Sequence, residues 1–377
     1  PVYKYDLEYR AFNGGDGETW LSGIVTEMEQ TNFDLEQLPL FRFMLCKALP
    51  DEYYIFIVLH HIIADGISAQ VFMSSVAKCY FAFQAGIDIG SGAKYSCTAY
   101  GVWQKSWVEK VREKALSFWE SHLGNDSLKL EINETGDKKA GRFDTLNASF
   151  RISESLNSQM RRLAIENGIT PFALYLAAYC ILLYKYTGQH SFAVGIPVAN
   201  RDKLEDQNVI GCYINVLPVR VQIDPHETAL SLAVKLADEF ASCLDYRHFP
   251  FEILAKTLDT EHSSLEHPIF QALFVFQNFE ESLQSDGSVP IKPYLLYKKY
   301  SEYAVTLELH DSRSQVGGFV QCQSVKWNEF TTHAMAEQYA IIAQEMATSP
   351  ELAVSQLQFC NMRERQKLLQ NSGAVKE

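Results

Sequence analysis

Short apolar runs of strand length alternate along the whole chain with longer segments that have the apolar period of a helix. This alternation limits the fold to a mixed class, because sheets and helices must cover one another's apolar faces. The strand-like runs lie at residues 41–46, 53–59, 191–198, 213–223, 270–277, 304–309 and 318–323. The helical patterns lie at residues 19–32, 68–85, 99–112, 115–123, 156–167, 171–184, 228–246 and 331–347. We therefore predict an α/β (α+β mixed) fold.

Two elements near the start of the chain are strongly patterned. The run at residues 53–59 (YYIFIVL) is continuously apolar, which predicts a strand buried on both faces. Ser68 is a good N-cap for the helix that follows, whose apolar stripe runs from Val71 through Cys79 and Tyr80 to Phe83.

The chain is long enough for two lobes. Its 377 residues exceed the usual size of a single hydrophobic core. A polar, glycine-containing stretch at residues 124–142 separates two richly apolar halves. We predict one lobe at residues 1–127 and a second at residues 128–377.

Composition excludes several classes. A net charge of −13 argues against a nucleic-acid partner, which requires a basic face. Eight scattered cysteines form no CxxC pair, and they are expected to be small buried side chains in a reducing compartment. The longest helical apolar run, residues 172–184, is too short to span a bilayer, and the first residues do not resemble a signal peptide. We expect a cytoplasmic protein with no membrane partner.

The chemistry is concentrated in residues 60–66, which read HHIIADG and follow the strand at 53–59. Successive strand side chains point to opposite faces, so one of His60 and His61 is expected to face the core or a neighbouring strand and the other an opening between lobes. Histidine is well suited to accept a proton near neutral pH. Asp65 can hold the loop through an ion pair or backbone N–H groups, and Gly66 allows an unusual backbone angle.

Other interpretations of this segment are open. A His-His pair at a strand end is more often structural than catalytic. His61 and Asp65 lie four residues apart and could bind a metal, but no third ligand follows at suitable spacing, so we predict no metal site. A Ser-His-Asp hydrolase is disfavoured because the chain has no Gly-x-Ser-x-Gly elbow.

The segment resembles the HHxxxDG signature of nonribosomal peptide synthetase condensation domains, which belong to the chloramphenicol-acetyltransferase-like superfamily. Further segments resemble the same family in order and spacing. They are residues 32–36 (NFDLE), 39–42 (PLFR), 194–201 (VGIPVANR), 210–220 (IGCYINVLPVR), 248–252 (HFPFE), 267–271 (HPIFQ) and 276–278 (FQN). The similarity starts near residue 30. Two motifs that normally precede it are missing, so the first lobe is expected to lack its usual start.

The same motifs distinguish this sequence from related domains of the superfamily. Two aspartates would replace the histidines in a heterocyclization domain, and the DFGWG element of plant-type acyltransferases is missing. Near the end, residues 321–327 (QCQSVKW) replace the pattern expected of the family.

The resemblance implies a fold and site roles. The fold would be two chloramphenicol-acetyltransferase-like lobes in a V, an acceptor-side lobe with HHxxxDG and a donor-side lobe, with a tunnel between them. The catalytic group would comprise His61, His60, Asp65 and Gly66, with Arg201 supporting the site as partner of Asp65. His61 would accept the acceptor amine's proton or position that amine. Ser68, Gln277 and Asn278 are expected to line the substrate tunnel.

The activity implied is amide-bond formation between a thioester-bound acyl or aminoacyl donor and a carrier-bound acceptor amine. No cofactor is expected in the domain itself, since the substrates arrive on phosphopantetheine or CoA thioesters. The expected partners are donor and acceptor peptidyl carrier proteins and neighbouring synthetase domains. Two alternatives are a starter-type or free-standing acyltransferase using acyl-CoA, and a non-catalytic docking domain of the same fold.

Overall fold

The structure is a computed structural model that describes residues 5–88, 96–124, 127–258, 267–277, 299–311 and 316–360. The chain forms two compact units. Unit 1 comprises Pro1–Trp103 and Arg201–Ile214, and unit 2 comprises Gln104–Asn200 and Asn215–Glu377. The predicted lobes at residues 1–127 and 128–377 divide the chain at a different point, and they stay a prediction.

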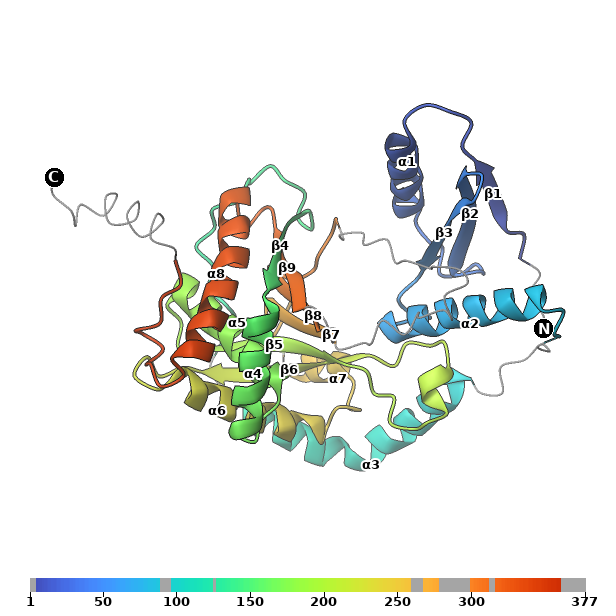
Figure 1. The fold of residues 1–377 in the computed structure, drawn as a ribbon. Coiled ribbons are helices and arrows are strands. Elements are labelled where there is room, and N and C mark those ends of the chain that lie inside the picture. The colour runs from blue at the N-terminus through green and yellow to red at the C-terminus, as the bar shows by residue number, and fades with distance from the viewer. Residues whose placement is uncertain are drawn as a thin grey trace, which may run out of the picture. The chain divides into compact units, whose positions relative to one another are not determined.

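Unit 1 is built on a three-stranded sheet with the order β1-β2-β3, in which β1 is parallel to β2 and β3 is antiparallel to it (Figure 1). Its elements are β1 (Glu8–Ala11), α1 (Gly17–Gln30), β2 (Phe41–Leu49), β3 (Glu52–Leu59), α2 (Gly66–Gln84), the start of α3 (Cys97–Leu123) and the 3-10 helix η1 (Asp206–Asn208). α1 packs its buried Ile24 and Met28 against Met44 and Cys46 of β2. This small cluster is the core on one face of the sheet.

The prediction that β3 is buried on both faces is wrong. Tyr54, Phe56 and Val58 pack on the α1 cluster, whereas Tyr53 and Ile55 are exposed. The reason is that alternate side chains of β3 point to opposite faces of the sheet, and α1 covers the face that carries Tyr54, Phe56 and Val58. A continuously apolar run therefore does not by itself show that both faces are covered.

Helix α2 begins earlier than predicted. Its N-cap is Asp65 rather than Ser68, because Asp65 has an extended backbone and its carboxylate accepts the backbone N–H of Ser68. The apolar stripe packs near its start, where Phe72 stacks on Phe43 of β2. Farther along, Tyr80 and Phe83 are exposed, so the stripe was predicted too long.

Unit 2 is built on a six-stranded mixed sheet with the order β4-β9-β8-β7-β5-β6. Neighbouring strands are antiparallel except for β8 with β7 and β7 with β5, which are parallel. The strands are β4 (Thr145–Ile152), β5 (Ser191–Val198), β6 (Asn215–Gln222), β7 (Ala272–Gln277), β8 (Val305–Asp311) and β9 (Val316–Gln323). The helices are the rest of α3, then α4 (Glu154–Glu166), α5 (Pro171–Thr187), α6 (Ala229–Leu244), α7 (Phe251–Leu258) and α8 (Glu329–Thr348). The predicted mixed α/β class is confirmed.

The core of unit 2 surrounds α5, which packs against α6, α8 and β7 (Figure 1). Thr170 and Pro171 start this helix as the sequence predicted, and its residues from Ala173 to Leu183 are buried. Among the described residues no single helix is long and apolar enough to cross a membrane. α4 and α5 meet this test by length and composition only as a pair, which bends by 110°.

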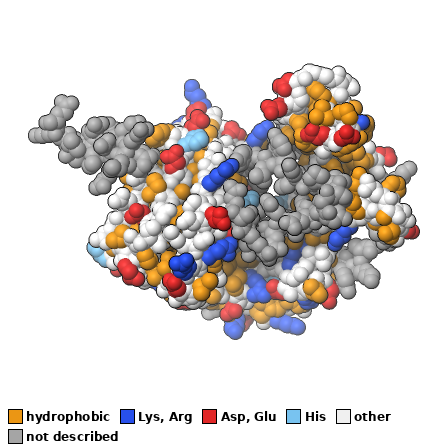
Figure 2. Space-filling model, in the orientation of Figure 1, with side chains coloured by type: hydrophobic (Ala, Val, Ile, Leu, Met, Phe, Trp, Pro, Cys, Tyr) orange, Lys and Arg blue, Asp and Glu red, His pale blue; other side chains and the backbone are white. Residues whose placement is uncertain are grey.

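Two further predictions are corrected here. Residues 99–112 and 115–123 were predicted as separate helices, but they form one helix, α3, because the residues between them include no helix breaker. The eight cysteines were all expected to be buried. Four of them are, but Cys79 and Cys212 are exposed. On the face drawn in Figure 2, acidic and basic side chains both occur among the described residues.

Candidate active site

The HHIIADG segment forms a tight loop between β3 and α2. The backbone N–H of His60 donates to the carbonyl of Leu40 (3.0 Å), which anchors the end of β3 to the residue before β2. The N–H of Ile63 then donates to the carbonyl of His60 (3.0 Å) and closes a turn. Asp65 follows as the N-cap of α2. The two histidines therefore lie at the tip of a loop that is fixed at both ends.

His60 and His61 lie in different environments. His60 is partly buried, its Nδ1 accepts the N–H of Ile62 (3.1 Å), and its ring lies edge-on to Phe33. His61 is exposed, and its Nδ1 lies 3.9 Å from Sγ of Cys212. The ring of His60 thus supports the loop, whereas that of His61 is accessible to a reactant.

A buried ion pair holds the loop from behind. Nη2 of Arg201 lies 2.9 Å from Oδ1 of Asp65, and each side chain is only 3% exposed. Nη1 of Arg201 donates to the carbonyls of Asp206 (2.5 Å) and Val209 (2.7 Å), and the guanidinium lies over the ring of Tyr213. The structure therefore brings together the two residues, 136 positions apart, that the family resemblance paired.

Ser68 extends this network to a second segment. Its fully buried hydroxyl donates to the carbonyl of Gly211 (2.8 Å) and accepts the N–H of the same residue (3.0 Å). Oδ1 of Asp65 accepts the N–H of Ser68 (2.8 Å) and also lies 2.8 Å from the Ser68 hydroxyl, whose single hydrogen it shares with the carbonyl of Gly211. Oδ2 accepts the N–H of Tyr213 (3.1 Å). Ser68 was expected at the substrate tunnel, but the structure places it inside this network.

The other predicted site residues are placed differently. Gly66 is the first residue of α2 and does not have the unusual positive φ that was expected, yet a Cβ at this position would meet nothing within 4 Å. The side-chain nitrogen of Gln277 donates to Glu308 (2.8 Å). Asn278 lies outside the described residues. Of these residues, Gly66 has open space beside it, which suits a bound reactant.

Three motif segments of unit 2, around residues 200, 215 and 247–251, are joined by hydrogen bonds from asparagine side chains to the backbone. Nδ2 of Asn215 donates to the carbonyls of Arg247 (2.8 Å) and Phe249 (2.7 Å), and its Oδ1 accepts the N–H of Phe251 (3.1 Å). Asn200, which has a positive φ of 49°, donates to the same carbonyl of Arg247. Both asparagines lie within segments that resemble family motifs, and no role was predicted for either from the sequence. Their hydrogen bonds to residues 247 and 249 join segments that are far apart in the sequence, and no local pattern indicates such contacts.

His267, from the segment HPIFQ, is part of an aromatic cluster in unit 2. Its ring stacks on Phe251 and contacts Phe270 and Tyr303. Burial lowers the pKa of His267 to about 4. This ring is therefore neutral at physiological pH.

A pH effect on stability follows from His267. Below its ordinary pKa of about 6.5, the unfolded chain binds a proton that the folded chain does not, so stability falls as the pH falls from 6.5 towards 4. By pH 5 the loss is about 2 kcal/mol. In His267→Phe the unfolding free energy from denaturant titration should decline less between pH 7.5 and 5 by this amount. The control is His226→Gln, which replaces an exposed histidine and should leave the pH dependence of the unfolding free energy unchanged. The same pH dependence in His267→Phe as in the parent would contradict the lowered pKa of His267.

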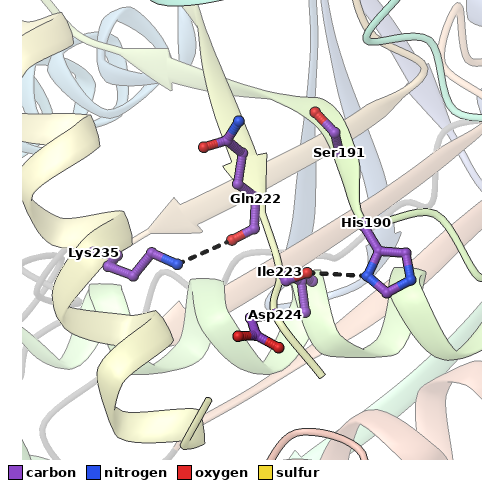
Figure 3. Close-up of a pocket in the computed structure, with 6 residues that line it drawn as sticks. All are labelled: His190, Ser191, Gln222, Ile223, Asp224 and Lys235. Carbon is purple, nitrogen blue, oxygen red and sulfur yellow. Dashed lines mark hydrogen bonds between the residues drawn. The ribbon is translucent and has the colours of Figure 1, made fainter. Parts of the chain in front are cut away.

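A hollow of about 330 Å³ lies on unit 2, lined by His190, Ser191, Gln222, Ile223, Asp224 and Lys235 (Figure 3). Its lysine and histidine side chains are already engaged. Lys235 donates to the carbonyl of Gln222 and pairs with Glu227 (3.0 Å), and Nδ1 of His190 lies 3.1 Å from the carbonyl of Ile223. We assign this hollow no ligand. Across the described ranges, no group of three His, Cys, Asp or Glu side chains could hold a metal ion.

The fold is mixed α/β, and its HHxxxDG loop carries an exposed histidine and an aspartate that is paired with a buried arginine. The family model that matches is the Condensation domain, over residues 5–369. Since this match covers nearly the whole sequence, the chain belongs to the condensation-domain family.

Known relatives agree with this membership. A linear gramicidin synthase of Brevibacillus parabrevis is 28% identical over 346 residues, which are 90% of this chain and 7% of that protein. Gramicidin S synthase 2 of Aneurinibacillus migulanus is 24% identical over 340 residues, 89% of this chain and 8% of that protein. The chain thus spans less than a tenth of the length of these relatives.

The fold is shared with solved structures. The X-domain from teicoplanin biosynthesis matches with a TM-score of 0.80 at 18% identity, covering 94% of this chain and 81% of that one. The condensation domain from monacolin K polyketide synthase matches with a TM-score of 0.77 at 20% identity, covering 92% and 81%.

Proposed function

We propose that this chain forms an amide bond between a thioester-bound acyl or aminoacyl donor and the amine of a carrier-bound aminoacyl acceptor. The observation that carries the proposal is the exposed His61 on a loop fixed by the buried pair of Asp65 and Arg201. A base held in place against a fixed scaffold costs little reorganisation during the reaction. Membership of the condensation-domain family supports the same activity.

In the proposed reaction the amine nitrogen of the acceptor attacks the thioester carbonyl of the donor. The new C–N bond forms, the C–S bond breaks, and the donor carrier leaves as a thiol. His61 accepts the proton that the amine loses, or holds that amine against the carbonyl, and the proton finally reaches the thiolate. The N–H of Gly66 would donate to the developing oxyanion; its position as the first residue of α2 supports this role, because helix N-termini present unpaired N–H groups.

The remaining site residues have supporting roles in this proposal. Asp65, Arg201 and Ser68 keep the loop in one conformation and do not touch the reactants. His60 supports the turn through the N–H of Ile62. Gln277 and Asn278 are proposed to line the path of a substrate in the donor-side lobe.

Substrates, partners and location belong to the same proposal. Donor and acceptor would arrive on the phosphopantetheine arms of peptidyl carrier proteins, within a synthetase that has neighbouring domains, and the domain itself would bind no cofactor. The very large size of the related synthetases supports such an arrangement. We propose a cytoplasmic location, which the free cysteines support.

The test is direct detection of the amide product. The chain is mixed with an acyl-loaded donor carrier and an aminoacyl-loaded acceptor carrier, and intact-protein mass spectrometry follows the acceptor. The expected result is an acceptor heavier by one acyl group, dependent on the chain. Parallel reactions with acyl-CoA as donor test the starter-type or free-standing alternative. Product from neither donor would overturn the proposal.

A non-catalytic docking role is the second candidate. The X-domain, which has a similar fold, also occurs in a complex with OxyB from teicoplanin biosynthesis. If the chain bound a partner protein with high affinity and gave no product with any donor, this second role would replace the first.

A further inference from the structure

Cys212 is an exposed side chain that the proposed reaction does not yet use. Its Sγ lies 3.9 Å from Nδ1 of His61, within hydrogen-bonding distance for a sulfur atom. The two residues are 151 positions apart in the sequence. Cys212 is thus a candidate to control the ring that we propose to be the base.

The contact is built into the loop network. Both sequence neighbours of Cys212 are fastened to the loop that starts α2. Gly211 exchanges two hydrogen bonds with the hydroxyl of Ser68, and the N–H of Tyr213 donates to Oδ2 of Asp65. A Cβ at Gly211 would overlap the Cβ of Cys97, so this backbone can approach closely only as glycine. Cys212 therefore stands at a fixed place relative to His61.

The partner of one imidazole nitrogen decides which nitrogen carries the proton. If Nδ1–H donates to sulfur, Nε2 keeps its lone pair and can accept a proton. If Nδ1 has no acceptor, the proton can move to Nε2, which is then unable to act as a base. The orientation of the ring is fixed by the same contact.

We propose that Cys212 is a positioning residue for His61: its sulfur accepts Nδ1–H, which fixes the ring and leaves Nε2 free to accept the proton of the acceptor amine. The effect of Cys212 on catalysis rests on the proposed function. Its effect on the tautomer of His61 does not, because the tautomer can be measured without substrate.

The first experiment measures the tautomer. The whole chain is labelled with ¹⁵N-histidine, and the signals of His61 are identified as those lost in His61→Gln. In the parent and in Cys212→Ser, the chemical shifts should show Nδ1 protonated. In Cys212→Ala the protonated nitrogen should be Nε2. Cys79→Ala, which removes another exposed thiol of unit 1, should match the parent. The same tautomer in Cys212→Ala and the parent would overturn the proposal.

The second experiment measures turnover with loaded carriers. Cys212→Ala should lower kcat about fivefold with KM unchanged, the scale of one lost hydrogen bond. Cys212→Ser should recover most of the rate, and Cys79→Ala should match the parent. An altered tautomer with unchanged kcat would overturn the positioning role. A Cys212-dependent tautomer in a chain that forms no product would support the contact and refute the proposed function, so the two failures are distinguishable.

Discussion

Replacing His61 with alanine should lower the rate of amide formation by about 10²-fold or more, the contribution expected of a positioned acid–base group. The reason is that His61 is the accessible ring on the HHIIADG loop, whereas His60 is partly buried and accepts the N–H of Ile62. The measurement is the initial rate with loaded donor and acceptor carriers, followed by mass spectrometry. Because His61 is exposed, the variant should unfold at the same temperature as the parent.

His60→Ala is the matched control in the same loop. It should lower the rate less than His61→Ala, because it removes a support of the turn and leaves the proposed base in place. Cys212→Ala serves as a second comparison, since it keeps the ring of His61 and removes the group at Nδ1. A folded His61→Ala variant with normal turnover would show that His61 is not the base.

Replacing Asp65 with alanine should lower the free energy of unfolding by about 3–5 kcal/mol. The reason is that Arg201 would remain buried with its charge unpaired, and the N–H groups of Ser68 and Tyr213 would lose an acceptor. Turnover should fall as well, because the same carboxylate holds the loop that carries His61. Denaturant titration measures the stability and the carrier assay measures the rate.

Two controls separate burial from charge. In Asp65→Leu combined with Arg201→Met, both charges are removed, and the loss of stability should be smaller than in either single variant. Glu27→Gln breaks the exposed pair of Arg10 and Glu27 in the same unit and should leave the unfolding midpoint unchanged. If Asp65→Ala were as stable as the parent and inactive, Asp65 would have a direct chemical role instead.

Much of the fold follows from local patterns. The strand at residues 191–198 was predicted with the bounds that the structure has, and Thr170 and Pro171 gave the start of α5. These elements were predictable because their residues are buried continuously and their end signals are local. The exposure of Tyr53 and Ile55 was not predictable, since it depends on which face of β3 is covered by another element.

The candidate site divides in the same way. The sequence by itself determined the HHIIADG loop, the different environments of its two histidines and the charge on Asp65, all within a few residues of one another. Only the tertiary structure decided that Ser68 is buried beside Asp65 and that Cys212 lies at His61. The pairing of Asp65 with Arg201 was suggested by a family resemblance, and the fold brings the two together across 136 positions. Periodicity and capping act between neighbours along the chain, whereas these contacts require a distant segment to return to the loop, and no local pattern records where it returns.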